Sequence, residues 1–450
     1  MLPDRSLHTI MTIPGRVSFG LRGVTGAGLG VLLSGCSGKA PSENTAKPLR
    51  QHAYVWQRDW NEAVRTAVME HSRDFAGLGV LGAQLSWESG SVKFVRPPVD
   101  WTVLARTGRP VGAVVRVERP VPAEAVPELA ALVIAEGKRL EDSAKAAGLT
   151  LVEVQVDYDA PQRKLADYTP WLHTVERGLE PLPVRITTLA SWLAEPEFRT
   201  LIAAADGYIL QVHSFDPPAP GQRAAVCDAG KTRAWVRQAA ALGKPFHVAL
   251  PTYRTTAGYD ASGKLLGVAT DGPAPEWPAG TVRQEFPSDA AALAGLVAEW
   301  QKERPVELQG IYWYRLPVAT DTRNWRWPAL AAVMSGRPPL SKMEVKMSGT
   351  APLDVVLSNS GEQDEWLPPR ITITWPGATP AAGDAVAGWS LATKAGRAVF
   401  SPPSPSAARL LPAGKSTAIG WLRFHEPAPP NTDIHPLIDP PAAPAPPRDR

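Results

Sequence analysis

Apolar runs alternate with amphipathic stretches from residue 52 to about residue 338. Eight of these runs begin near Ala53, Phe75, Val111, Leu151, Val184, Gly207, Pro245 and Gly310. Most are almost continuously apolar, which is typical of parallel strands buried on both faces. Their starts are about 37 residues apart on average, enough for a strand and a helix. The pattern therefore predicts a (β/α)8 TIM barrel over residues 52–338.

Two of the intervening stretches have clear helical boundaries. Residues 123–147 are amphipathic and are followed by Gly148, a residue that commonly ends helices. Residues 288–303 begin with Ser288 and Asp289 and stop before Pro305. Helices between the apolar runs agree with the predicted barrel.

The pattern changes after Pro338. Short alternating runs (MEVKM, LDVVLSN, ITITW and AIGWLRF) are separated by Gly, Pro and Ser, without a helical period. This pattern predicts a small antiparallel β-sandwich over residues 341–426. Residues 427–450 are rich in Pro and Ala, and we expect a disordered tail there.

The N-terminus resembles a bacterial lipoprotein signal. Arg16 and Arg22 precede a Gly-rich, weakly apolar run that ends in Leu33-Ser34-Gly35-Cys36. The run is shorter than the roughly 20 apolar residues that a spanning helix needs. The alternative is a short buried helix that happens to end in a cysteine.

We therefore expect a signal peptide over residues 1–35, a lipid on Cys36 and a polar tether over residues 36–51. The chain would then be exported and anchored to a membrane of the cell envelope. Ser37 after the cysteine favours the outer membrane.

Cysteine content and charge exclude a disulfide-rich protein and a nucleic-acid-binding protein. Cys36 and Cys227 are the only cysteines, so a lipid on Cys36 leaves no disulfide framework. Residues 1–35 hold a net +2 of the total +3, which leaves +1 for the processed chain. Such a balanced charge provides no basic field for nucleic acid, so we expect no nucleic-acid partner.

Polar residues interrupt the fourth apolar run with a period of two. Glu153, Gln155, Asp157 and Asp159 therefore share one face, which we expect to be the barrel interior. Burying four polar groups is costly unless they serve a site or a closed hydrogen-bond network. Asp157 and Asp159 would lie roughly 6.5 Å apart along the strand. Such a pair can divide into one protonated and one ionised group, as general acid/base catalysis requires. The alternative is a structural network that ties the strand end to its loop.

Other strand ends contribute candidate substrate-binding residues, because TIM-barrel sites lie at the carboxyl ends of the strands. Besides Gln155, these candidates are Glu88, Glu118, Gln211, His213, Tyr253, Tyr314 and Arg315. His213 has the alternative of a hydrogen-bonded barrel histidine, and Arg315 that of an ion pair with Asp157 or Asp159.

Tryptophan is unusually frequent, with 16 Trp against 9 Phe and 8 Tyr. Several lie near the predicted strand ends, and Trp56 is the candidate that we assign to substrate binding. Flat amphipathic rings suit the faces of sugars. Ordinary packing between barrel and helices is the alternative, and we expect it to explain more than half of them.

We expect no cofactor and no metal. Residues 77–82 fit G-x-G-x-x-G, but they lie inside an apolar run and do not open the helix that would hold a phosphate. The eight histidines show neither H-x-H nor H-E-x-x-H spacing, and the two cysteines are remote from each other, so zinc has no support.

The strand-end sequences VEVQVDYDAP, LADYTPWL, LQVHSF and GIYWYRLP together resemble a bacterial family catalogued as domain of unknown function family 3142. The resemblance covers roughly residues 53–338 and implies a barrel like those of glycoside hydrolases, with Asp157 and Asp159 after the fourth strand. Many retaining glycosidase barrels carry their second carboxylate after the seventh strand. Here that strand ends in Pro251-Thr252-Tyr253, without an acid.

The leading hypothesis is a cell-envelope enzyme that hydrolyses or remodels a polysaccharide. Asp159 would be the proton donor and Asp157 a charge tuner or second acid/base group. The missing seventh-strand acid leaves an inverting pair with Glu88 or Glu118, a substrate-assisted route, or no catalysis. The rivals are a non-catalytic carbohydrate-binding lipoprotein and an envelope scaffold acting through its C-terminal domain.

Overall fold

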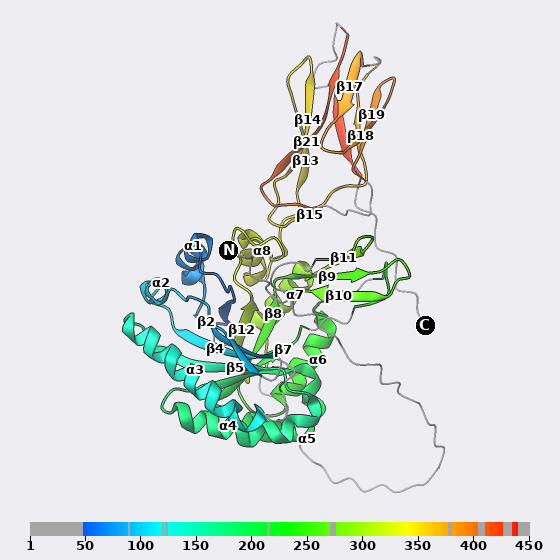
Figure 1. The fold of residues 1–450 in the computed structure, drawn as a ribbon. Helices are drawn as coiled ribbons and strands as arrows, with labels where there is room; N and C mark the ends of the chain where they lie inside the picture. Colours follow the sequence, from blue (N-terminus) through cyan, green and yellow to red (C-terminus); the bar gives the residue numbers. More distant parts are fainter. Residues whose placement is uncertain are drawn as a thin grey trace, which may run out of the picture. The chain divides into compact units, whose positions relative to one another are not determined.

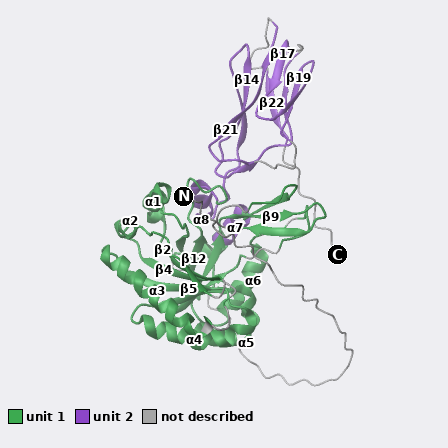
Figure 2. Ribbon diagram, in the orientation of Figure 1, with its two compact units in different colours: residues 1–289, 298–324 green, residues 290–297, 325–450 purple. Residues whose placement is uncertain are grey.

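A computed structural model describes residues 48–439, except 89–90, 119–120, 122–124, 214–216, 223, 225, 271–275, 377–379, 404–409 and 426–433. The predicted signal peptide, the predicted lipidation site at Cys36 and most of the predicted tether lie outside these residues. The chain divides into two compact units, coloured separately in Figure 2. One contains residues 1–289 and 298–324, and the other contains residues 290–297 and 325–450.

The first unit is a closed parallel barrel with helices outside the ring of strands (Figure 1). The barrel order is β1-β12-β8-β7-β6-β5-β4-β2, and pairing of β1 with β2 closes the ring. All eight apolar runs form its strands, which confirms the predicted TIM barrel. Their bounds are β1 Arg50–Val55, β2 Gly77–Glu88, β4 Val111–Val117, β5 Leu151–Tyr158, β6 Val184–Leu189, β7 Gly207–Gln211, β8 Phe246–Pro251 and β12 Leu308–Tyr314.

Helices follow the barrel strands along the chain. They are α1 Glu62–His71, α2 Trp101–Arg106, α3 Val126–Ala146, α4 Leu165–Leu179, α5 Pro196–Ala203, α6 Ala229–Ala240, α7 Ala290–Lys302 and α8 Trp327–Met334. Asn61, Asp100 and Asp228 cap α1, α2 and α6 by accepting a backbone N–H in the first turn. The two helices expected from sequence correspond to α3 and α7.

Two additions to the barrel were not predicted. Strand β3 (Ser91–Val95) pairs antiparallel with the far end of β2 and forms a hairpin. Between β8 and α7, strands β9 (Arg254–Tyr259), β10 (Leu265–Ala269) and β11 (Val282–Pro287) form a three-stranded antiparallel sheet. A buried cluster that includes Tyr253, Tyr259 and Phe286 packs against Tyr314, so this inserted sheet adjoins the end of β12.

The glycines of residues 77–82 lie within β2, as expected. A side chain at Gly79 would come within 2.8 Å of the Tyr54 ring, and one at Gly82 within 2.4 Å of Leu140. These glycines therefore permit close packing on both faces of the strand and do not open a helix.

The second unit contains a β-sandwich. One sheet has the order β13-β14-β21-β17 and the other β18-β19-β16-β22, and side chains from both sheets form one buried core. The strands are β13 Met343–Ser348, β14 Leu353–Asn359, β15 Glu365–Trp366, β16 Ile371–Thr374, β17 Ala382–Ala385, β18 Ser390–Lys394, β19 Arg397–Ser401, β20 Leu410–Leu411, β21 Ser416–Arg423 and β22 His435–Ile438.

The sandwich extends beyond the predicted boundary at residue 426. Strand β22 lies in the segment expected to be a disordered tail, and it pairs with β16 from Ile371 to Thr374. The Pro-rich composition concealed a four-residue strand that lies at the edge of its sheet, where proline is tolerated.

Within the described residues, no helix is both long enough and apolar enough to cross a membrane.

Candidate functional site

The polar side chains of β5 point into the barrel, as their period of two predicted. Glu153, Gln155 and Asp157 are buried, and each contacts side chains from other barrel strands. They lie at successive heights along β5. Their contacts divide them into two groups, one in the middle of the barrel and one at its carboxyl end.

Glu153 and Gln155 belong to a closed network in the barrel interior. Gln155 Oε1 accepts a 2.8 Å hydrogen bond from Tyr54 Oη, and its Nε2 donates to Glu153 Oε1 at 2.6 Å. Glu153 Oε1 also accepts from Tyr312 Oη at 3.1 Å, and Arg185 Nε lies 2.8 Å from its Oε2. We call Tyr54, Glu153, Gln155, Arg185 and Tyr312 the base network. Each of these side chains has a polar partner inside the barrel.

Two histidines pack against the base network, and the buried His52 Nε2 has no hydrogen-bond partner among the described residues. Arg185 Nη1 lies 3.1 Å from His247 Nδ1, and His52 stacks on Tyr312 at a centroid distance of 4.6 Å. Burial, followed by the charges of Arg185 and Arg50, lowers the pKa of His52 to about 4. Burial also lowers the pKa of His247, and nearby His52 and Arg185 lower it further. Burial raises the pKa values of Tyr54 and Tyr312 well above their ordinary range. Both histidines are therefore neutral at pH 7.

Asp157 lies one step closer to the carboxyl end of β5. Its Oδ1 accepts from Thr187 Oγ1 at 2.6 Å and from Gln211 Nε2 at 3.3 Å. Arg116 Nε lies 3.9 Å from its Oδ2. Two donors and one cation, from β6, β7 and β4, therefore converge on this carboxyl group.

Asp159 is the first residue after Tyr158, the last residue of β5, and it is half-buried. The following loop is held by Gln162, whose Nε2 donates to Ser191 O at 2.8 Å and to Glu195 Oε1 at 3.1 Å. Asp159 therefore lies at the mouth, at the beginning of a loop that is tied to the next β/α connection.

Aromatic side chains form part of the same mouth. The rings of His213 and Tyr314 stack at 5.6 Å with an interplanar angle of 20°. Tyr253 Oη lies 3.2 Å from His213 Nδ1. Trp56 packs edge-on against Tyr314 at 5.0 Å, and the Arg116 guanidinium lies 5.7 Å from its ring. His213 and Tyr314 are half-buried and present some surface, whereas Trp56 is only 6% exposed.

Trp56, a predicted substrate-binding residue, is largely buried. Its ring belongs to the interior cluster with Tyr54 and Tyr312, so most of its surface contacts protein. Trp60, Trp192 and Trp313 are buried as well. Most of the surface of these tryptophans is therefore used in packing, and the role of Trp56 in substrate binding stays a prediction.

The candidate acids of the second and third barrel strands lie in different surroundings. Glu118 follows β4, accepts a hydrogen bond from Gln84 Nε2, and lies 3.8 Å from Arg58 Nη2. Glu88 pairs with Ser91 at the end of the β2–β3 hairpin, beyond Leu85, the last β2 residue that pairs with β4. The pairing between β2 and β4 thus ends before Glu88, because β2 continues beyond the barrel into the hairpin with β3.

Arg315 forms an ion pair with Asp321, six residues further along the chain. Arg315 Nε donates to Asp321 Oδ2 at 3.0 Å. Its backbone N–H donates to Thr252 Oγ1 at 2.7 Å, and Thr252 Oγ1 donates to Arg315 O at 2.8 Å. The cation beside Asp157 is Arg116. The alternative that Arg315 pairs with Asp157 or Asp159 stays a prediction.

Sequence reasoning missed Arg116 and Thr187. Arg116 is separated by two residues from Val114, which faces the interior, and it is the single charged residue of β4. The same parity argument that identified Asp157 would have placed Arg116 inside the barrel. Thr187 had no comparable signal, because threonine is common in strands of any burial.

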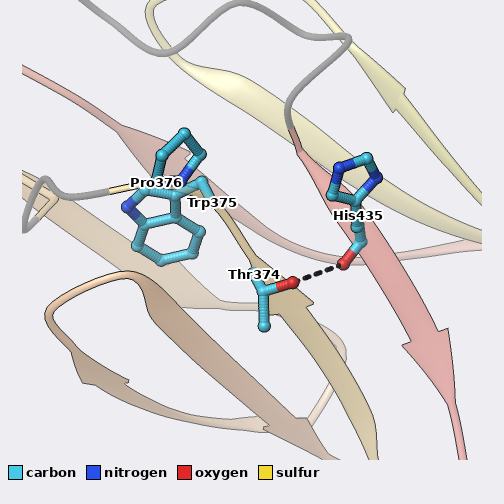
Figure 3. Close-up of a pocket in the computed structure, with 4 residues that line it drawn as sticks. All are labelled: Thr374, Trp375, Pro376 and His435. Carbon is cyan, nitrogen blue, oxygen red and sulfur yellow. Dashed lines mark hydrogen bonds between the residues drawn. The ribbon is translucent and has the colours of Figure 1, made fainter.

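A search of the described residues for groups of three or more metal-ligating side chains found none. A separate cavity of about 350 Å³ lies in the sandwich, where Thr374, Trp375, Pro376 and His435 line it (Figure 3). Thr374 Oγ1 donates to His435 O at 3.3 Å. None of these four side chains carries a carboxyl group, so the cavity lacks the carboxyl groups found at the barrel mouth.

The fold and the inward carboxyl groups define a (β/α)8 barrel protein with an acidic strand end. Residues 107–319 match the model of the family described as "Domain of unknown function (DUF3142)". This match confirms the resemblance noted from the strand-end sequences. Residues 345–425 match a second family, "Domain of unknown function (DUF8456)".

Several solved structures share distant similarity with the chain. A chitinase from Chromobacterium violaceum ATCC 12472 is 15% identical with a TM-score of 0.44, covering 64% of this chain and 98% of its own. Chitinase ChiA74 from Bacillus thuringiensis is 10% identical with a TM-score of 0.45, covering 87% and 100%. The spore cortex-lytic enzyme SleL of Bacillus cereus is 12% identical with a TM-score of 0.44, covering 60% and 71%. A comparison with curated proteins gave no match.

Proposed function

We propose that the barrel is a carbohydrate-active domain that hydrolyses or remodels a polysaccharide at its mouth. The observation that carries the proposal is the setting of Asp157. Its carboxyl group contacts Thr187, Gln211 and Arg116 at the carboxyl end of β5, two residues before Asp159. Active sites of this fold lie at that end of the strands.

The proposed roles follow from position and chemistry. Asp159 is half-buried at the mouth and acts as the proton donor to the leaving oxygen. Asp157 lies deeper and tunes the charge around Asp159. The half-buried rings of Tyr314 and His213 provide an apolar surface with polar edges that suits a sugar face. Gln211 and Tyr253 provide hydrogen bonds that orient the ring.

A retaining mechanism with two carboxylates has no support at the seventh strand. β8 ends in Pro251, and Thr252 and Tyr253 follow it without an acid. The Thr252 hydroxyl is engaged with the Arg315 backbone. A retaining mechanism needs a second carboxyl group about 5 to 5.5 Å from the first. Because no acid follows β8, catalysis would use an inverting pair with Glu118 or a group of the substrate itself. The same observation favours a second candidate, a carbohydrate-binding protein without catalysis.

The test uses the chain lacking residues 1–36, assayed for hydrolysis and binding on a panel of envelope and plant polysaccharides. Asp159→Asn should lower hydrolysis by roughly 10² to 10⁴-fold, because an amide cannot transfer the proton. Asp167→Asn on α4 is the matched control, since Asp167 is 60% exposed and pairs with Lys164 at 2.9 Å. Equal rates in the two variants would remove Asp159 from the mechanism. Binding without hydrolysis by the unaltered chain would support the second candidate.

We also propose that the chain is a lipoprotein of the cell envelope, anchored through Cys36. The basic residues, apolar run and small residues before this cysteine support the proposal. Cys36→Ala should leave an unprocessed precursor that incorporates no radiolabelled fatty acid. Labelling of that variant at the level of the unaltered protein would contradict the anchor.

A further inference from the structure

A group of aromatic side chains packs behind the carboxyl end of β5. It consists of Tyr158, Tyr168 and Trp171 together with Trp192, and we call it the α4 aromatic cluster. Ring centroids are 5.4 Å apart for Tyr158 and Tyr168, 4.9 Å for Tyr168 and Trp171, and 6.3 Å for Tyr168 and Trp192. The cluster joins α4 and the β6–α5 connection to the last residue of β5.

Three polar atoms of this cluster are buried and unpaired. Tyr168 Oη, Trp171 Nε1 and Trp192 Nε1 have no hydrogen-bond partner among the described residues, which run without a gap from 126 to 213. The three residues are 3%, 8% and 0% exposed. Buried donors are almost always satisfied by protein or by enclosed water, and each unsatisfied group is costly. Three such donors in one cluster indicate that an acceptor is enclosed with them.

The surroundings of Tyr168 include both carboxyl groups of the strand end. Burial raises the pKa of Tyr168 well above its ordinary value, and Asp157, Tyr158 and Asp159 raise it further. The phenol therefore keeps its proton, and it lies within electrostatic range of both Asp157 and Asp159. A neutral phenol is a donor that can satisfy a carboxylate directly or through one water molecule.

We infer that Tyr168 is a positioning residue for Asp159, and that its buried hydroxyl donates to the Asp159 carboxylate through one water enclosed by the α4 aromatic cluster. The phenol donates to the water, and the water donates one of its two hydrogen atoms to the carboxylate. The contact fixes the orientation of the carboxyl group and stabilises its ionised form. The inference rests on the proposed function only for the role of Asp159 as proton donor.

The free energy of unfolding of Tyr168→Phe gives the first test, because the two possibilities differ in sign. A hydroxyl that has no partner is a cost, so its removal would stabilise the protein. A hydroxyl that holds a water and a carboxylate stabilises the fold, so its removal should lower the thermal midpoint. Tyr208→Phe is the matched control: Tyr208 is also a buried tyrosine, but its hydroxyl contacts Ala239 O at 3.5 Å. A higher midpoint for Tyr168→Phe than for the unaltered protein would overturn the inference.

Titration of the Asp159 carboxyl gives the second test and needs no substrate. Protein labelled with ¹³C at the aspartate carboxyl groups is followed by NMR against pH, with Asp159→Asn identifying the signal. Tyr168→Phe should raise the pKa of Asp159 by about one unit, since a donor to the ionised form is lost. Tyr208→Phe should leave it unchanged. Coincident titrations of Tyr168→Phe and the unaltered protein would overturn the inference.

Activity on a polysaccharide would add a third readout. A proton donor with a raised pKa remains protonated to higher pH, so the alkaline limb of kcat in Tyr168→Phe should move upward by the same interval. The alkaline limb of kcat could instead stay in place although the carboxyl titration of Tyr168→Phe has shifted. That result would refute Asp159 as the proton donor but leave the positioning contact intact. The failures of the two proposals are therefore distinguishable.

Discussion

The barrel contains two sets of polar residues that follow the same alternating pattern in the sequence but have different surroundings in the structure. The base network, around Glu153 and Arg185, is closed: its side chains contact one another, and Glu153 is only 6% exposed. The mouth, around Asp157 and Asp159, contains half-buried groups such as His213 and Gln211. Both come from one alternating run, so the depth of a polar residue in the barrel distinguishes a structural network from a candidate site.

The difference has an energetic basis. Charges in the base network are removed from water and depend on each other, as the 2.8 Å contact between Arg185 and Glu153 indicates. Removing one partner leaves an uncompensated charge in a medium of low dielectric. Asp157 is about as buried as Glu153, at 8% against 6% exposed, but its neighbours Asp159, Gln211 and His213 keep some contact with solvent and remain accessible to a ligand. We expect stability to depend on the base and function to depend on the mouth.

The largest effect should come from Glu153→Gln. This change keeps the shape of the side chain but leaves Arg185 without its carboxylate, and we expect the free energy of unfolding to fall by about 3 to 5 kcal/mol. Urea unfolding measures this loss. Asp157→Asn is the comparison at the mouth, where Oδ1 keeps its bonds to Thr187 and Gln211 and only the 3.9 Å contact with Arg116 is lost, and we expect a loss of about 1 kcal/mol. Equal losses would mean that Asp157 also belongs to a structural network.

A smaller effect should appear on acidification. The pKa of His52 is about 4 in the folded chain against 6.5 for an ordinary histidine, so the unfolded chain binds the proton first. Stability should therefore fall as the pH drops from about 6.5 toward 4, by up to about 3 kcal/mol from this group. His52→Phe keeps a ring against Tyr312 and removes the titration. Unfolding followed from pH 7 to 4.5 should be less steep in this variant, and parallel curves would contradict the buried neutral histidine.

The smallest effect should follow from Tyr253→Phe at the mouth. The variant loses the 3.2 Å contact with His213 Nδ1 but keeps the ring that packs against Tyr314. We expect the free energy of unfolding to fall by about 1 kcal/mol or less, with a several-fold weaker affinity for the glycan that the unaltered chain binds. Thermal melts and calorimetric titration measure the two quantities. A loss of stability as large as that of Glu153→Gln would erase the distinction between mouth and base.

The barrel was predictable because strands buried on both faces must be apolar, and all eight runs met that condition. The inserted strands β9 to β11 were not, since their sheet is partly exposed and β11 carries Arg283, Gln284 and Glu285 in succession, unlike a strand buried on both faces. Parity predicted that Glu153, Gln155 and Asp157 point inward, because side chains in a strand alternate strictly. Parity gives a direction but no partner, which is why it did not reveal the ion pair between Arg315 and Asp321, six residues away.

The central claim, that the mouth is a glycan site, is tested most directly by a crystal structure of Asp159→Asn with an oligosaccharide from the polysaccharide that the unaltered chain binds best. The variant keeps the shape of the site and prevents turnover. We predict sugar density over Tyr314 and His213, with a glycosidic oxygen within hydrogen-bond distance of Asn at position 159. Density elsewhere on the chain, or an empty mouth at saturating oligosaccharide, would contradict the account.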